Sequence, residues 1–265
     1  MSRMAYEGVH ELIHSAETGS ARFPLTDLFN EGWMLRLVLL WFSSHDLPGH
    51  VLAFEPRASW FSEAMLPSPF APRHRGDRRG GARTHSDGVI GHIQVGSTGK
   101  VDVALLPDAS QLVVTEAKMF SLLSSGTRNA PTYDQAARNV ACMAEMLFRV
   151  RRTPSQLRSL AFLVVAPEAQ IKGSSLAAKL EKDSIERAVR ARAASYWPDL
   201  DQWVERRLIP TIQAAHIGCL SWEQIIADIR RRDAPTSDSL AAFYERCLQY
   251  NSPAGREREP GQGQD

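Results

Sequence analysis

Two carboxylates and a lysine occupy two short apolar runs in the middle of the chain. Asp102 lies at the start of the run 101–106 (VDVALL), and Glu116 and Lys118 close the run 111–118 (QLVVTEAK). Because side chains alternate across a β-strand, Glu116 and Lys118 share one face of the second run. If the two runs pair as neighbouring strands, Asp102 and Glu116 approach each other at the end of a sheet.

This combination of side chains suits metal-assisted hydrolysis of a phosphodiester bond. Two carboxylates held together repel each other, and a divalent cation removes that penalty. Mg²⁺ or Mn²⁺ takes hard oxygen ligands, which Asp102, Glu116 and the backbone carbonyl of Ala117 can supply. Lys118 cannot ligate a cation, but its ammonium group can orient an attacking water and stabilise charge on the phosphate.

The elements that would position these residues form an antiparallel meander. Strand-like runs at 88–95, 101–106 and 111–118 are separated by the turn clusters GSTG and PDAS. A helix is expected at 132–151, and a strand at 160–166, whose continuous hydrophobicity predicts burial on both faces. This order predicts an α/β fold in which a mixed sheet has helices on both sides.

Further elements flank this core. Thr26 or Asp27 is the expected N-cap of a helix at 26–44. The other expected elements are helices at 4–16, 59–65, 173–196, 199–208, 221–232 and 237–249 and a strand at 212–219. The chain therefore divides into an N-terminal helix (1–22), an α/β core (23–220), C-terminal helices (221–250) and a disordered tail (251–265).

The pattern D-x13-E-A-K on adjacent strands resembles the PD-(D/E)xK nuclease superfamily, which includes restriction endonucleases and RecB-like nuclease domains. The resemblance covers residues 26–166 and implies a restriction-endonuclease-like fold with an α-β-β-β-α-β core. It also implies Mg²⁺- or Mn²⁺-dependent cleavage of nucleic acid, with DNA expected before RNA. Val101 stands where the superfamily motif has its leading proline.

Two further residues correspond to positions that this superfamily often uses. Glu31 lies on the helix before the meander, where the resemblance implies an acidic residue that assists at the metal. The alternative is a carboxylate favoured by the helix dipole. Gln135 follows Tyr133-Asp134 and matches loosely a glutamine that RecB-like members carry after the lysine. It would position a phosphate or a metal-bound water. Asp87 precedes Gly88, and a turn aspartate is favoured there over a residue of the site.

Two other motifs offer competing chemistry. His10-Glu11-Leu12-Ile13-His14 is an H-E-x-x-H sequence, in which two histidines can bind zinc while Glu11 acts as a base. Few residues precede this motif and no xxGxxH follows it, so an amphipathic helix with exposed histidines is favoured over a zinc peptidase. The GSTGK run at 96–100 lacks the glycine and the hydroxyl residue of a phosphate loop and predicts a turn.

Basic residues gather locally although the net charge is only +1. Residues 67–84 are rich in Pro, Gly and Arg and predict a mobile loop, either a linker or a basic flap over a phosphate backbone. Arginine clusters at 149–152, 187–192 and 230–232 either stabilise helix ends or follow nucleic acid. A non-catalytic nucleic-acid-binding module on the same fold is therefore the alternative to a nuclease.

Composition limits the remaining possibilities. Of 265 residues, 43% are hydrophobic and 23% charged, which is typical of a globular domain. The three cysteines are widely spaced, which argues against a disulfide framework and a thiolate zinc site, so a cytoplasmic location is expected. The longest apolar run, near 33–42, is too short to span a bilayer, and no membrane partner is expected. A homodimer is left open.

Overall fold

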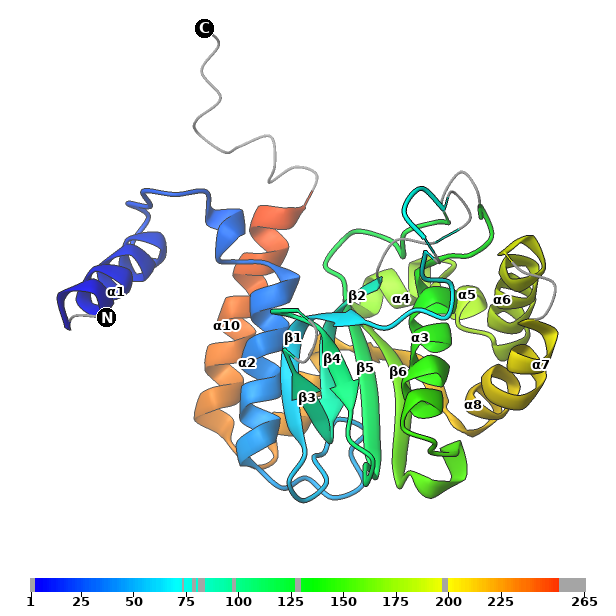
Figure 1. Cartoon of the computed structure of the whole chain (residues 1–265). Helices are drawn as coiled ribbons and strands as arrows, with labels where there is room; N and C mark the ends of the chain where they lie inside the picture. The colour runs from blue at the N-terminus through cyan, green and yellow to red at the C-terminus, as the bar shows by residue number, and fades with distance from the viewer. Residues whose placement is uncertain are drawn as a thin grey trace, which may run out of the picture.

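A five-stranded mixed sheet forms the centre of the computed structural model (Figure 1). Its strand order is β1-β2-β5-β6-β7. β1 (Ser59–Leu66), β2 (Thr84–Gly91) and β5 (Gln111–Ala117) are antiparallel to their neighbours in this series. β6 (Ser159–Ala166) and β7 (His216–Ser221) continue from β5 in parallel. The structure describes residues 3–72, 74–77, 80, 84–96, 99–126, 130–196 and 200–252, with the side chains of residues 3 and 4 left out.

Helices cover both faces of this sheet. α2 (Glu31–Ser44), α9 (Trp222–Arg230) and α10 (Ala234–Asn251) share one hydrophobic cluster with one face of the central strands. α3 (Gln135–Arg149) and α6 (Lys182–Tyr196) contribute to the cluster on the other face. The predicted mixed sheet with helices on both sides is therefore confirmed.

The remaining elements are short, apart from the N-terminal helix. They are α1 (Arg3–Glu17), η1 (Leu25–Asp27), β3 (Ile93–Val95), β4 (Val103–Leu105), η2 (Pro154–Gln156), α4 (Glu168–Gly173), α5 (Leu176–Lys179), α7 (Asp201–Trp203), a π-helical turn (Val204–Leu208) and α8 (Ile209–Ala214). The helix expected over 173–196 is thus interrupted, and the last strand begins at His216 because α8 occupies the residues before it.

Alternation along β5 explains why it lies at the centre of the fold. Leu112 and Val114 point into the α3 cluster, whereas Val113 and Ala117 point into the α2 cluster. All seven residues of β5 are buried. β6 is buried along seven of its eight positions, so the predicted burial of that strand on both faces is confirmed.

Two local expectations on the N-terminal side are wrong. Residues 59–65, expected as a helix, belong to the edge strand β1, which is hydrogen-bonded to β2 along its length. Sheet pairing here outweighs the helix propensity of Glu, Ala, Met and Leu. α2 begins at Glu31 rather than 26, because Asn30 is the N-cap and accepts a hydrogen bond from the Trp33 N–H at 2.9 Å.

The predicted meander is also wrong in its membership. β4 does not pair with β5; it pairs with β3 in a separate two-stranded sheet. The three antiparallel strands of the main sheet are β1, β2 and β5, and the β3–β4 hairpin is an excursion between the last two. Short-range turn signals at 96–99 and 107–110 mark chain reversals, but they do not specify which strand is the partner.

The ends of the chain and the predicted basic loop are described in part. α1 projects from the body of the molecule (Figure 1), and Arg246 of α10 donates hydrogen bonds to the carbonyls of Ala16 and Glu17 at its end. Residues 73, 78, 79 and 81–83 of the predicted loop, and the predicted tail from 253 onward, lie outside the described residues. No helix in the described ranges is long and apolar enough to cross a bilayer.

Gly88 allows α2 to approach the sheet closely, which gives a test of this packing. A Cβ atom at Gly88 would lie 2.5 Å from the Thr115 hydroxyl and 3.1 Å from the side chains of Leu35 and Leu39. Gly88→Ala is therefore expected to lower the free energy of unfolding by about 1–3 kcal/mol in denaturant titrations. Gly173→Ala is the control, because nothing lies within 4 Å of its Cβ position. Equal stability of the two variants would contradict this packing.

Candidate active site

Asp87 and Glu116 lie opposite each other on neighbouring strands. Gly88 of β2 pairs with Thr115 of β5, and the next position along this antiparallel register brings Asp87 opposite Glu116. Directly opposed side chains point to the same face of a sheet. The Asp87 carboxylate also accepts a hydrogen bond from the Ala117 N–H at 2.7 Å, which fixes it at the end of β5.

Lys118 and Gln135 both donate to the same oxygen of Glu116. The Lys118 Nζ lies 2.6 Å from Glu116 Oε1, and the Gln135 Nε2 donates to that atom from the first turn of α3. The Gln135 Oε1 accepts the Ser124 N–H at 3.0 Å, so its amide nitrogen faces Glu116. The structure therefore brings together three of the residues that the sequence singled out.

The surroundings of Glu116 disfavour its charged form. The pKa of Glu116 is raised to about 8, first by burial and then by the nearby Asp87 carboxyl, while Lys118 opposes both effects. Glu116 is only 1% exposed, and among the described residues no hydrogen-bond partner reaches its Oε2. A buried carboxylate with one oxygen left without a partner is costly unless another group binds it.

Neighbouring elements hold the end of β5 in place. The Lys118 N–H donates to the Val165 carbonyl of β6 at 2.8 Å, which extends the parallel pairing by one residue. The Lys118 carbonyl accepts the indole N–H of the fully buried Trp222 at 2.9 Å. Asp134, the N-cap of α3, fixes the start of the helix that carries Gln135. Rigid elements therefore position each polar side chain of the site.

The same end of β5 has oxygen atoms that fit a hard divalent cation. Asp87 and Glu116 supply carboxylates, and the unpartnered Glu116 Oε2 is the atom that most needs a cation. The N–H and C=O of one residue point to the same edge of a strand, so the Ala117 carbonyl faces β2 as its N–H does. Within the described ranges, no group of three or more His, Cys, Asp or Glu could hold an ion. Two carboxylates completed by a carbonyl and water match how Mg²⁺ is commonly bound.

Asp102 does not lie on a strand next to Glu116, which corrects the expected pairing. Its backbone bridges Met65 of β1, and β1 and β2 lie between it and β5. Three strand spacings, about 14 Å along the sheet, therefore separate Asp102 from β5. The Asp102 carbonyl accepts the Gly96 N–H at 2.9 Å, and its carboxylate would meet a Cβ at Gly99, so Asp102 closes the turn before β4. Asp87, which the sequence favoured as the turn residue, takes the expected place of Asp102.

Glu31 lies in the helical layer opposite α3. It is the first residue of α2, and its charge contributes, after burial, to the raised pKa of Cys247 on α10. No hydrogen bond or ion pair between described residues joins Glu31 to Glu116. The structure thus does not bring Glu31 into the cluster of Asp87, Glu116, Lys118 and Gln135.

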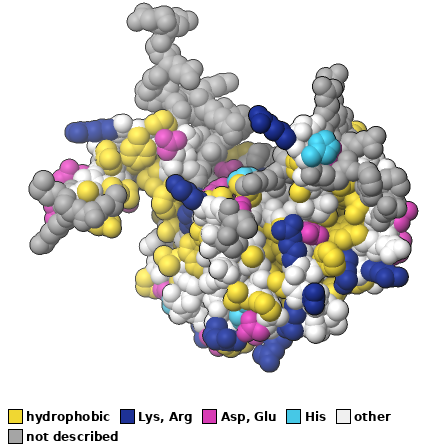
Figure 2. Space-filling view, viewed as in Figure 1, with side chains coloured by type: hydrophobic (Ala, Val, Ile, Leu, Met, Phe, Trp, Pro, Cys, Tyr) yellow, Lys and Arg dark blue, Asp and Glu magenta, His cyan; other side chains and the backbone are white. Residues whose placement is uncertain are grey.

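The competing motifs have different surroundings. His10 and His14 lie on the exposed surface of α1, where His14 is 3.6 Å from Glu17. Several arginines of the predicted basic clusters pair with carboxylates on the surface: Arg149 with Glu145, Arg190 with Glu186 and Glu205, Arg230 with Asp238, and Arg231 with Asp228. Figure 2 shows basic side chains scattered over one face of the molecule. These pairs reduce the positive charge available to a nucleic-acid backbone.

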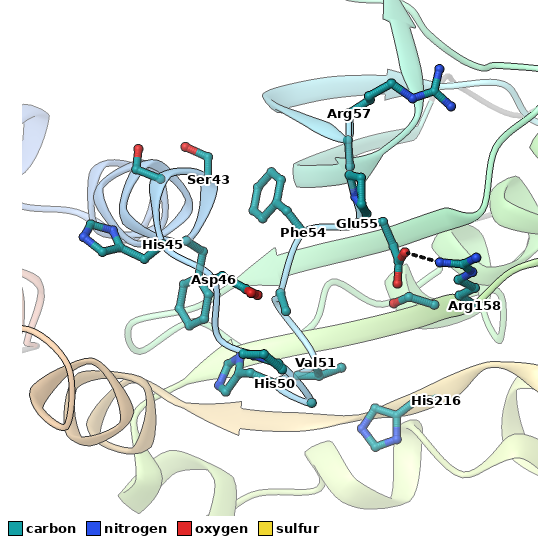
Figure 3. A pocket seen from close by; sticks show the side chains of 18 residues that line it. Ser43, His45, Asp46, His50, Val51, Phe54, Glu55, Arg57, Arg158 and His216 are labelled. Atoms are coloured by element: carbon teal, nitrogen blue, oxygen red, sulfur yellow. Dashed lines mark hydrogen bonds and ion pairs between the residues drawn. The ribbon is translucent and has the colours of Figure 1, made fainter.

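A large hollow lies at the other end of the sheet, and several of its polar groups have partners. It has a volume of about 1020 Å³ and lies between the end of α2, the segment 45–58 and the starts of β6 and β7 (Figure 3). Arg158 pairs with Glu55 at 3.4 Å. His50 accepts the Leu52 N–H at Nδ1, so its proton is on Nε2, which lies 3.3 Å from Asp228. Burial lowers the pKa of His50. This arrangement indicates a structural role for the pair of His50 and Asp228.

Comparisons of the chain with family models, with curated proteins and with solved structures find no match. The site is therefore assigned on its own geometry and charge. Asp87 is the residue of this cluster that the sequence analysis interpreted as a turn aspartate and not as part of the site. The available signal was an aspartate directly before the apolar run Gly88-Val89-Ile90, which belongs to the buried second half of β2.

The raised pKa of Glu116 predicts how the stability of the metal-free protein depends on pH. The folded state binds the Glu116 proton more tightly (pKa about 8) than the unfolded state (4.5). This contribution to stability is present below pH 4.5 and is lost as the pH rises through 8. In the presence of a chelator, denaturant titrations from pH 5 to 8.5 should show this loss. Glu116→Gln should remove it, whereas the exposed-site control Glu168→Gln should retain it. If the free energy of unfolding depended on pH in the same way in the parent, Glu116→Gln and Glu168→Gln, the raised pKa of Glu116 would be contradicted.

Proposed function

We propose that this protein is a Mg²⁺- or Mn²⁺-dependent nuclease that hydrolyses phosphodiester bonds, with DNA expected before RNA. One observation carries the proposal: Glu116 is a buried carboxylate with one unpartnered oxygen, set between a second carboxylate and an ammonium group. Structural ion pairs rarely retain a second acid in this position, because like charges in a buried site raise the energy of the ionised state.

The order of elements around the site supports this proposal. α2, β1, β2, β5, α3 and β6 follow one another as α-β-β-β-α-β, with the β3–β4 hairpin inserted between β2 and β5. This is the core order that the resemblance to PD-(D/E)xK nucleases implies. Asp87 on β2 and Glu116-Ala117-Lys118 at the end of β5 supply the acid and the E-x-K of that motif on paired strands.

The chain offers ligands for the proposed cation at Asp87, Glu116 and the Ala117 carbonyl. When bound, the cation supplies positive charge that offsets both carboxylates and favours attack by water on phosphorus. Its binding competes with the proton that Glu116 otherwise holds, so the raised pKa of this carboxyl makes affinity dependent on pH.

Lys118 and Gln135 have separate tasks in this proposal. Lys118 has three N–H donors and uses one on Glu116, which leaves others to orient the attacking water and to stabilise charge on the phosphate. Gln135 donates to the same Glu116 oxygen as Lys118 and thereby fixes the carboxylate relative to the lysine. Because the site is largely buried, these interactions are stronger than they would be in water.

Arg138 adds a second cation beside the site. It lies one helical turn after Gln135 on α3, and its guanidinium donates to the Ser124 hydroxyl. Its planar group carries further donors that match phosphate oxygens. The polar strip of Gln135 and Arg138 therefore gives the substrate backbone a place to bind next to Lys118.

The first test of activity is incubation with plasmid, single-stranded DNA and RNA, with Mg²⁺ or Mn²⁺ and beside a chelated control. Metal-dependent shortening of at least one substrate is the expected result. Binding of nucleic acid with no product under any metal condition would favour the non-catalytic module instead.

The two aspartates supply a matched pair of variants for the catalytic assignment. Asp87→Asn and Lys118→Ala are each expected to reduce cleavage at least about 100-fold, because the first removes a ligand of the proposed cation and the second removes the ammonium group that stabilises the phosphate. Asp102→Asn should keep the parental rate, because Asp102 lies beside β1, away from β5. Initial rates on a labelled substrate measure this, with thermal melts to check folding. Full activity of Asp87→Asn together with loss in Asp102→Asn would reverse the assignment.

A further inference from the structure

The segment that follows Lys118 presents two apolar side chains to solvent beside the candidate site. Phe120 is 39% exposed and Leu122 is 53% exposed, whereas Met119 and Leu123, on either side of this exposed stretch, are buried. The two buried side chains therefore anchor the segment at both ends, and the residues between them face solvent. These exposed residues begin two positions after the lysine of the candidate site.

Hydrogen bonds fix the backbone of this segment at several points. The Ser121 carbonyl accepts from Gln170 Nε2 at 2.7 Å, and the Leu123 carbonyl accepts from Lys179 Nζ at 3.3 Å. Ser124 and Gln135 are joined by two bonds, one in each direction, both at 3.0 Å. Phe120 and Leu122 are therefore held outward by an anchored backbone, which lowers the entropy lost when a ligand contacts them.

Groups that suit a phosphate lie on both sides of this apolar pair. Lys118 precedes it at a Cα distance of at most about 7 Å from Phe120, the reach of two extended residues. Arg138 is connected to the other end of the segment through Ser124. In a nucleotide, the phosphate and the planar base are separated by a distance similar to that between Lys118 and Phe120. An aromatic ring offers a surface on which any base can stack.

We propose that Phe120, with Leu122 beside it, stacks on an unpaired nucleobase next to the scissile phosphate. The substrate is then single-stranded or unstacked at the point of cleavage, because paired bases in a duplex stack on each other and do not expose their faces to a side chain. This inference rests on the proposed function for the position of the phosphate, but stacking itself can be measured without cleavage.

The chain provides a matched control in Phe148. This side chain is 42% exposed, nearly the same as Phe120, and lies near the far end of α3. It lies thirteen positions after Gln135 on this helix, which corresponds to about 20 Å along the helix axis. Phe120→Ala, Phe120→Tyr and Phe148→Ala are compared with the parent on a single-stranded oligonucleotide and on its duplex, with Mg²⁺ or Mn²⁺ present.

Cleavage of the single strand should be at least tenfold faster than cleavage of the duplex. Phe120→Ala should lower kcat/KM on the single strand about tenfold, since one base–aromatic stack contributes about that factor. Phe120→Tyr should restore most of the rate, and Phe148→Ala should match the parent. In parallel, a 2-aminopurine base in the oligonucleotide reports stacking through quenched fluorescence, with Ca²⁺ replacing the active metal. Quenching should be lost only in Phe120→Ala.

The outcomes separate this inference from the proposed function. Equal cleavage of single strand and duplex, or the same activity in Phe120→Ala as in Phe148→Ala, would overturn the stacking proposal and leave the nuclease proposal standing. A parent protein that makes no metal-dependent product would contradict the nuclease proposal. The fluorescence measurement then decides alone: quenching lost only in Phe120→Ala supports the stacking surface, and quenching unaffected by Phe120→Ala overturns it.

Discussion

The site depends on a single unfavourable arrangement, the burial of the Glu116 carboxylate next to Asp87. Burial and the second carboxylate both favour the protonated form, and Lys118 and Gln135 together occupy only one of the two Glu116 oxygens. A buried charge is tolerated only when its partners are held in good geometry. The sheet, the first turn of α3 and the indole of Trp222 supply that geometry, because each fixes a group that contacts Glu116 or its strand.

The two ends of the central sheet differ in how far their charged side chains are paired. Around the hollow at the far end, His50, Arg158 and Arg57 each pair with a carboxylate. At the carboxyl end of β5, the carboxyl groups of Asp87 and Glu116 lie close to each other, and one ammonium group, that of Lys118, contacts Glu116. A binding site for a cation and its phosphate ligand is expected where the fold leaves a buried carboxyl oxygen without a partner, as at Glu116 Oε2. Among the described residues, none of the buried side-chain atoms without a partner belongs to the lining of the larger hollow.

Local patterns in the sequence predicted the central part of the fold, and long-range pairing limited the rest. The burial of β6, the helix that carries Gln135 and the proximity of Glu116 and Lys118 follow from periodicity within one segment. The strand that pairs with β5 does not follow from periodicity, because the predicted strands 88–95 and 101–106 are both short runs with an aspartate at or directly before their start. The choice between Asp87 and Asp102 depends on which run pairs with β5, and turn residues do not encode that choice. β1 was missed for a similar reason, since only its pairing with β2 makes residues 59–66 a strand.

The most direct test of this account is a crystal of the protein soaked in Mn²⁺ and measured for anomalous scattering. The account predicts one strong peak within about 2.0–2.6 Å of a carboxylate oxygen of both Asp87 and Glu116. A peak at Asp102 instead, or Asp87 and Glu116 bonded to each other with no ion between them at saturating Mn²⁺, would contradict it.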